Sequence, residues 1–277
     1  VILNDVNSII LGDAGTSNMT SLSVTASGAI TDGGQLFITG TTSLAAGTAN
    51  DITLDAANNF GGAVSVVSGK NVTLNDNDGI DLGASTISGA LNVVVAGAIT
   101  DSGALNVSGA TTLTAGAGND ITLNNANDFA STVRVVSARD VTLNDINSID
   151  LGSAAGATTI SRDLVVTANG AITDGGVLNI AGTTSLTAGA ANNITLNNAN
   201  DFGDAVSVVS ANNATFTDVD NIIFGASTIS GDLAVTTTNG AVTQTGALAV
   251  TGTSNINAGA AAIILAAGND FGGAVSL

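Results

Sequence analysis

Apolar and polar residues alternate along this chain in short runs, and Gly, Asn and Asp separate the runs. In Ile121-Thr122-Leu123, strand alternation places the two apolar side chains on one face and the threonine on the other. Residues 132–136 alternate in the same way, and residues 137–140 supply the corner that follows. β-Branched residues in period two between regular turn clusters predict strands and argue against helices.

The alternating runs recur at a nested period. Most runs carry a threonine after an apolar residue, and the recurring anchors are Ile2, Thr31, Thr53, Thr73, Thr100, Thr122, Thr142, Thr173, Thr195, Thr215, Thr243 and Ile264. Two short intervals of 20 to 22 residues follow each of the first three long intervals of 27 to 31 residues, and one follows the fourth. Phenylalanines in Asn-Asn-Phe or Asn-Asp-Phe contexts recur independently 69, 73 and 69 residues apart, at Phe60, Phe129, Phe202 and Phe271. Four copies of a unit of about 70 residues predict a repeat architecture.

The short interval is long enough for one closed circuit of the chain and leaves little room for loops. Stacked circuits form parallel strands about 4.8 Å apart. We therefore expect an all-β fold, a right-handed parallel β-helix (β-solenoid) of about twelve coils, with about three coils per repeat. Residues 1–277 are expected to form a single segment of a longer chain or filament. The long interval must carry an extra segment, as a protruding loop or a wider coil, around residues 12–22, 83–88, 152–161 and 225–230.

Composition narrows the classes of partner. The formal net charge is −18, with 22 acidic and 4 basic residues, which disfavours nucleic acid and anionic membrane surfaces. The chain has no Cys or Pro, so disulfides and thiolate metal sites are excluded and Gly, Asn and Asp must make the turns. No apolar run reaches the roughly 18 residues that span a bilayer, so membrane insertion is not expected.

Three segments carry a family resemblance. They are Asn-Asp-Ile-Thr-Leu-Asn-Asn-Ala-Asn-Asp-Phe, Gly-Ala-Ile-Thr-Asp-Gly-Gly and Leu-Thr-Ala-Gly-Ala. Together they resemble the repeat regions of filamentous-haemagglutinin-type bacterial surface proteins, which are often exported by two-partner secretion. The resemblance covers essentially the whole chain. It implies a β-helical shaft in an extracellular or cell-surface adhesin.

Recurring aspartates are the main candidates for chemistry. One corner carries Asp5, Asp76, Asp145 and Asp218, and another carries Asp32, Asp101 and Asp174. The richest stretch, residues 75–81, offers a weak candidate Ca²⁺ site at Asp76, Asp78 and Asp81, since Ca²⁺ takes six to eight oxygen ligands. Asp and Asn are also the usual corner residues, so the structural alternative stays open. No other cofactor is expected.

The remaining signals favour scaffold roles over catalysis. The threonine row is one residue wide, which fits an exposed β-strand better than an ice-binding face. An enzyme is not expected, because His and Cys are absent and every prominent aspartate recurs with the repeat. The four basic residues are scattered and are interpreted as solvated face residues or local partners for acids. With no Trp or Tyr, and with phenylalanines that look internal, a carbohydrate ligand has little support.

The sequence thus predicts a structural shaft, or a filament-forming subunit, of a secreted or cell-surface bacterial fibre. Its expected partner is itself, end to end or side by side, because nearest-neighbour stacking extends indefinitely. An adhesin that binds a host, cell or polysaccharide ligand through its long-interval loops is the first alternative. A Ca²⁺-stabilised extracellular module is the second.

Overall fold

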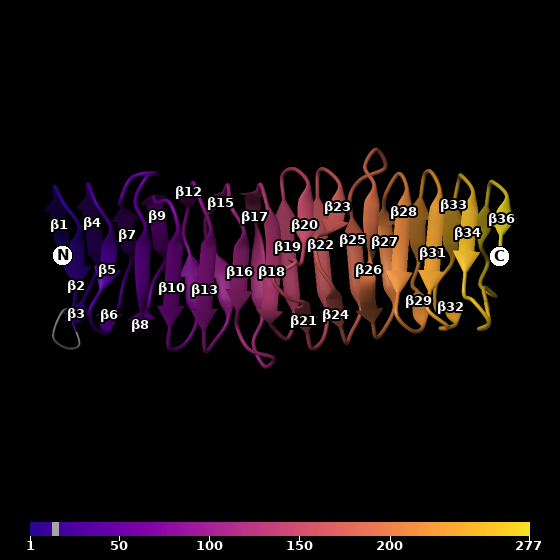
Figure 1. The fold of residues 1–277 in the computed structure, drawn as a ribbon, viewed down its shortest axis with the longest axis horizontal. Coiled ribbons are helices and arrows are strands. Elements are labelled where there is room, and N and C mark those ends of the chain that lie inside the picture. The colour runs from indigo at the N-terminus through magenta and orange to yellow at the C-terminus, as the bar shows by residue number, and fades with distance from the viewer. Residues whose placement is uncertain (13–16) are drawn as a thin grey trace. The chain divides into compact units, whose positions relative to one another are not determined.

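A computed structural model describes residues 1–12 and 17–277. The described chain contains strands and turns and no helix (Figure 1). Its parallel strands stack as a β-solenoid of about 14 turns. The predicted all-β solenoid is therefore confirmed. By contacts the chain divides into two compact units, Val1–Ala138 and Arg139–Leu277, which are described separately.

The first unit contains 18 described strands. They are β1 (Ile2–Asp5), β2 (Ile9–Leu11), β3 (Ser17–Met19), β4 (Leu22–Ala26), β5 (Ile30–Asp32), β6 (Leu36–Ile38), β7 (Thr42–Ala45), β8 (Ile52–Phe60), β9 (Val64–Ser68), β10 (Val72–Asp76), β11 (Ile80–Leu82), β12 (Ser85–Ile87), β13 (Leu91–Val95), β14 (Ile99–Asp101), β15 (Leu105–Val107), β16 (Thr111–Thr114), β17 (Ile121–Phe129) and β18 (Thr132–Ser137). One parallel sheet runs β1-β4-β7-β9-β11-β14-β17, and a second runs β2-β5-β8-β10-β13-β16-β18. Shorter sheets, β3-β6-β8 and β12-β15-β17, complete the coils.

The second unit repeats this arrangement. Its strands are β19 (Val141–Asp145), β20 (Ile149–Leu151), β21 (Thr158–Ile160), β22 (Leu164–Ala168), β23 (Ile172–Asp174), β24 (Leu178–Ile180), β25 (Thr184–Thr187), β26 (Ile194–Phe202), β27 (Val206–Ser210), β28 (Ala214–Asp218), β29 (Ile222–Phe224), β30 (Ser227–Ile229), β31 (Leu233–Thr237), β32 (Val242–Gln244), β33 (Leu248–Val250), β34 (Ser254–Asn257), β35 (Asp270–Phe271) and β36 (Val275–Ser276). The sheets run β19-β22-β25-β27-β29-β32, β20-β23-β26-β28-β31-β34-β36, β21-β24-β26 and β30-β33-β35.

The interior consists of columns of like residues from successive coils. Ile30, Ile52 and Val72 are paired in register, and each is at most 1% exposed. Burying one such side chain stabilises the fold by about 1.5–3 kcal/mol. In the second unit Phe216 adds an aromatic column, because its ring lies 6.3 Å from that of Phe202 in an edge-to-face contact. Apolar burial coil by coil therefore holds the stack together.

The long interval carries an extra strand rather than a wider coil. Val72 lies opposite Ile52 on one side and Leu91 on the other, so a circuit stays near 20 residues through this region. The extra residues of the second and fourth copies form β12 and β30, which corrects the predicted protruding loop at 83–88 and 225–230. Part of the first predicted loop, residues 13–16, lies outside the described residues.

This extra strand moves the threonine anchors from one sheet to another. Thr31, Thr53 and Thr73 pair in one row of the second sheet. Thr100 pairs instead with Asp81 and Thr122 in the first sheet. The single threonine ladder suggested by the sequence is therefore wrong: the row breaks after each copy and resumes on a neighbouring sheet.

Candidate functional site

The most strongly built polar feature is an aspartate–asparagine pair that clamps each long bent strand. In the second copy Asp101 accepts hydrogen bonds from the amides of Asn124 and Asn125, at 3.0 and 3.2 Å, and from Asn127 Nδ2 at 2.8 Å. Asn127 in turn accepts the amide of Leu105 at 2.8 Å. These contacts satisfy the backbone donors that the bend in β17 removes from its ladder. The aspartates of this corner are thus structural.

The same clamp recurs with the same atoms in the other copies. Its pairs are Asp32 with Asn58, Asp101 with Asn127, and Asp174 with Asn200. In the fourth copy Gln244 replaces the aspartate: Gln244 and Asn269 exchange two amide hydrogen bonds of 2.8 and 2.9 Å. An amide therefore substitutes for the carboxylate, which points to hydrogen bonding and not to charge as the requirement at this position.

A second set of aspartates is buried at the other predicted corner. Asp76 is 1% exposed, and its two carboxylate oxygens accept the amides of Phe60 and Asp78 at 2.8 and 2.9 Å. Asp218 is fully buried and accepts the amide of Phe202 at 3.0 Å in the same way. Burial raises the pKa of both carboxyls to about 6, although the amide donors pull in the opposite direction.

The three residues of the predicted Ca²⁺ site are engaged in different contacts. Both oxygens of Asp76 are occupied by backbone amides, and Asp78 Oδ2 accepts Asn59 Nδ2 at 3.1 Å. Asp81 lies half-buried on β11, away from that corner. No group of three or more acidic side chains placed to hold a metal ion occurs among the described residues. The calcium hypothesis stays a prediction without a preformed set of ligands.

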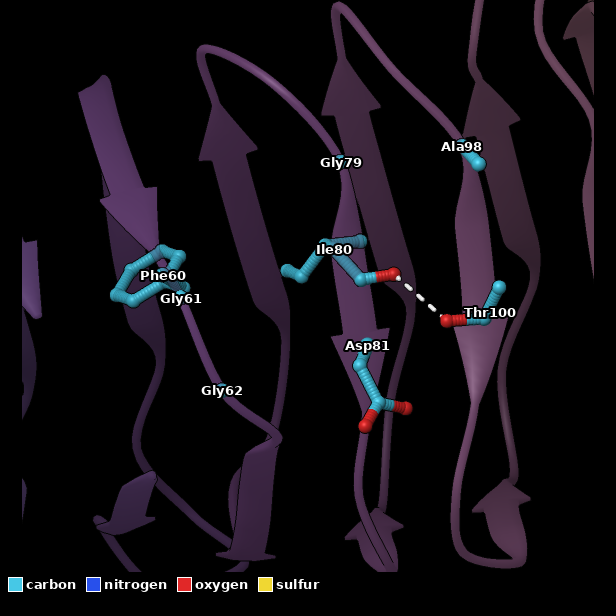
Figure 2. A pocket seen from close by; sticks show the side chains of 8 residues that line it. All are labelled: Phe60, Gly61, Gly62, Gly79, Ile80, Asp81, Ala98 and Thr100. Atoms are coloured by element: carbon cyan, nitrogen blue, oxygen red, sulfur yellow. Dashed lines mark hydrogen bonds between the residues drawn. The ribbon is translucent and has the colours of Figure 1, made fainter. Parts of the chain in front are cut away.

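Asp81 lines a hollow of about 250 Å³ between adjacent coils (Figure 2). The other lining residues are Phe60, Gly61, Gly62, Gly79, Ile80, Ala98 and Thr100. Asp81 Oδ1 is buried without a hydrogen-bond partner, while the neighbouring Thr100 hydroxyl donates to the Ile80 carbonyl at 3.4 Å. Rotation of the Thr100 hydroxyl toward its register partner Asp81 would satisfy the carboxylate. The equivalent residues Asp150 and Thr173 already make this bond, at 3.1 Å. The unpaired oxygen of Asp81 in this hollow therefore has a structural explanation.

The third copy carries a loop that the second and fourth copies lack. Between β20 and β21, an antiparallel bridge joins Ser153 to Gly156, and Ala154 and Ala155 at its tip are exposed. Beside this loop lies a groove of about 420 Å³, whose lining includes Val177. The sequence placed a long-interval loop at 152–161, and in this copy the structure does contain one.

Arg139 and Arg162 form local ion pairs with neighbouring aspartates, which is one of the two interpretations of the basic residues. Arg162 Nε lies 3.1 Å from Asp140 Oδ1 and 3.3 Å from Asp163 Oδ2. Arg139 Nε lies 3.5 Å from Asp140 Oδ2. All four side chains are partly exposed to solvent, where such pairs contribute at most about 1 kcal/mol.

Phe37 is exposed, which corrects the prediction that the phenylalanines are internal. The pattern suggested internal phenylalanines, which holds for Phe60, Phe129 and Phe202, each at most 2% exposed. Phe37, however, is 38% exposed and projects from the outer face of β6. Its position in Leu36-Phe37-Ile38, between two inward residues, gives the outward direction by strand alternation.

Comparison with known families assigns the repeat itself. Residues 1–67, 69–136, 138–209 and 211–277 each match the family described as repeats of unknown function, DUF5649. The chain belongs to the DUF5649 family. The four matched DUF5649 segments coincide with the four copies counted in the sequence. No curated protein and no solved structure matches the chain. Among the described residues of this DUF5649 protein there is no helix with the length and apolar character to cross a membrane.

Proposed function

We propose that this DUF5649 chain is a structural shaft, or a filament-forming subunit, of a secreted or cell-surface bacterial fibre. The finding that best supports this role is that the recurring carboxylates form hydrogen bonds within the stack. Asp32, Asp101 and Asp174 clamp bends, while Asp76 and Asp218 bind backbone amides at corners. Residues that recur with the repeat thus serve the stack itself, as expected for a spacer.

The outermost strand of the first unit offers an edge for the stacking of a further coil. β1 pairs with β4 on one side, and Ile2 and Val1 are 78% and 54% exposed. Unpaired strand edges are templates for further parallel pairing. A further copy of the repeat, in the same chain or in another, has the register to cover such an edge. The resemblance to filamentous-haemagglutinin-type proteins is consistent with this role and with export to the cell surface.

Electron microscopy of the purified 277-residue protein tests the shaft. We expect elongated particles that join end to end as the concentration rises. Ile2→Lys should lower this association, because a lysine on an edge strand opposes pairing. Val67→Lys is the matched control, since Val67 is 58% exposed on β9, away from the edge. Compact, isolated particles at all concentrations would contradict the proposal.

An adhesive role is the second candidate, and the loop of the third copy favours it. The groove beside residues 153–157 breaks the repeat, as recognition surfaces on a repetitive scaffold are expected to do. Deleting residues 153–156 leaves Gly152-Ala157, the same Gly-Ala link that joins β11 to β12. Beads coated with this variant should adhere to cultured epithelial cells less than beads coated with the unmodified protein. Equal adherence would exclude the groove as the adhesive surface.

A further inference from the structure

Phe37 is an aromatic side chain held on an outer sheet face between two amide side chains. Parallel register places Asn18 of β3 opposite it on one side and Asn59 of β8 on the other. Asn18 is exposed and Asn59 is half-buried, with Asn59 Nδ2 oriented by Asp78 Oδ2 at 3.1 Å. The side chains in register across these three coils are therefore an amide, an aromatic ring and a second amide.

The surface around this row is hollowed. A depression of about 230 Å³ is lined by Asn18, Met19, Thr20, Phe37 and Thr39. Its lining thus combines one aromatic face and one thioether with an amide and two threonines. Such a mixture provides an apolar platform rimmed by groups that donate and accept hydrogen bonds.

The same outer position is polar in the next two copies. It is Asn106 in the second and Asn179 in the third, followed in register by Asp128 and Asp201. A hollow of about 180 Å³ recurs at Asn179, so the depression belongs to the repeat. The aromatic ring belongs to the first copy alone among these three. This change is not required for packing, because the other copies fold around an asparagine.

We propose that the face formed by Asn18, Phe37 and Asn59 binds a neutral polysaccharide. The Phe37 ring would cover the C–H face of one sugar ring, and the flanking amides would hydrogen-bond its hydroxyls. The net charge of −18 and the nearby Asp78 disfavour uronic or sulfated sugars and favour a neutral chain. The proposal extends the adhesive role to a second face, separate from the groove of the third copy, and it is independent of the shaft.

A protein partner fits this face less well. A stable protein interface buries about 1,600 Å² and centres on several apolar anchors. Here one ring is surrounded by Asn and Thr side chains. The size and polarity match a sugar ring and its hydroxyls more closely than a protein core.

Calorimetric titration of the whole 277-residue protein tests the proposal. The probes are hexasaccharides of β-1,4-linked glucose and of α-1,4-linked glucose, with hexagalacturonic acid as the acidic comparison. We expect one neutral hexasaccharide to bind at one site, and Phe37→Ala to weaken it about tenfold or more. Val67→Ala, an exposed change on β9, should leave binding unchanged. Melting curves of all variants verify folding.

A gain-of-binding variant makes the test independent of loss by misfolding. Asn106→Phe places a ring at the equivalent exposed position, between Thr86 and Asp128, and should raise the stoichiometry toward two. Three results would overturn the proposal: no binding of either neutral probe, equal binding by Phe37→Ala, or tighter binding of the acidic probe. Loss of self-association without loss of sugar binding in Phe37→Ala would assign the face to protein contacts instead. None of the three overturning results bears on whether the protein forms a shaft.

Discussion

Asn200 Nδ2 donates to Asp174 Oδ2 over 2.7 Å and joins two side chains that are 26 positions apart, both of them buried. Through Asp174 the bend of β26 is fixed to the preceding coil, and through Asn200 Oδ1 the amide of Leu178 is satisfied at 2.9 Å. One buried pair therefore fixes backbone from two coils, which makes it a sensitive point for stability.

Asp174→Ala should lower the free energy of unfolding by about 2–4 kcal/mol, because it leaves two backbone amides and Asn200 without their acceptor. Denaturant unfolding followed by circular dichroism measures the change. Asp201→Ala, an exposed aspartate on the same strand β26, is the control and should change stability by less than about 0.5 kcal/mol. Equal effects of the two substitutions would rule out the clamp.

Buried Asp76 and Asp218 predict a pH dependence of stability. Their pKa is about 6 in the folded protein against 3.8 ordinarily, so the folded state binds more protons between these values. Stability should therefore fall as pH rises from about 4 to about 6, and be regained on acidification. Melting temperatures measured across this range check the direction.

The paired variant Asp76→Asn with Asp218→Asn isolates these two carboxyls from the general repulsion of an acidic protein. It should flatten the dependence, whereas Asp55→Asn, at an exposed position on β8, should not. An unchanged slope in the paired variant would show that the two carboxyls do not cause it.

Buried threonine hydroxyls predict substitutions that stabilise. Thr42, Thr111 and Thr184 occupy one repeating inward position, are each 1% exposed, and have an Oγ1 without a hydrogen-bond partner. A buried unpaired hydroxyl costs about 1–3 kcal/mol, and valine has nearly the same shape. Thr111→Val should therefore raise the melting temperature, while exposed Thr86→Val should not. A lower melting temperature for Thr111→Val would indicate that the hydroxyl has a partner.

Two glycines differ in how closely the adjacent coil approaches them, and their substitutions should therefore differ in effect. A Cβ on Gly109 would lie 2.5 Å from the carbonyl carbon of Gly89 in the adjacent coil, whereas one on Gly118 would meet nothing within 4 Å. Gly109→Ala should destabilise by about 1–3 kcal/mol through overpacking. Gly118→Ala should be neutral or slightly stabilising. Chemical denaturation of the two variants provides the comparison.

A calcium titration tests the weak site at Asp76, Asp78 and Asp81. We expect no change in melting temperature at millimolar Ca²⁺, because the Asp76 oxygens already accept two backbone amides. Mg²⁺ at equal concentration controls for general screening of the acidic surface. A Ca²⁺-specific rise that Asp78→Asn abolishes would restore the calcium hypothesis.

The fold was predictable because the repeat constrains it at every level. The alternation in residues 132–136 predicted that Val133 and Val135 point inward, and both are buried in β18. The long interval was harder to predict, because residues 83–88 are a short stretch of mostly small and polar residues that resembles a loop. Their strand β12 forms because its inward side chains, Ser85 and Ile87, complete a coil beside Leu105 and Val107. That information is in the neighbouring coil, not in the segment.

The polar sites were only partly predictable. The recurrence of Asp101 and Asn127 is visible in the sequence, but their pairing across 26 residues depends on coil register. The prediction of internal phenylalanines fails at Phe37, which lacks the Asn-Asn or Asn-Asp context of Phe60. The alternation of its immediate neighbours was the signal that could have placed it outside.

The transfer of equivalent strands between sheets has a consequence for display. β5 of the first copy and β14 of the second copy correspond in sequence, yet they belong to different sheets of the same unit. Their counterparts in the second unit, β23 and β32, also belong to two different sheets. A surface feature encoded once per copy therefore lies on a different sheet in the next copy. Lengthening such a protein by whole repeats would therefore present the feature on alternate sheets, and would not simply multiply contacts on one plane.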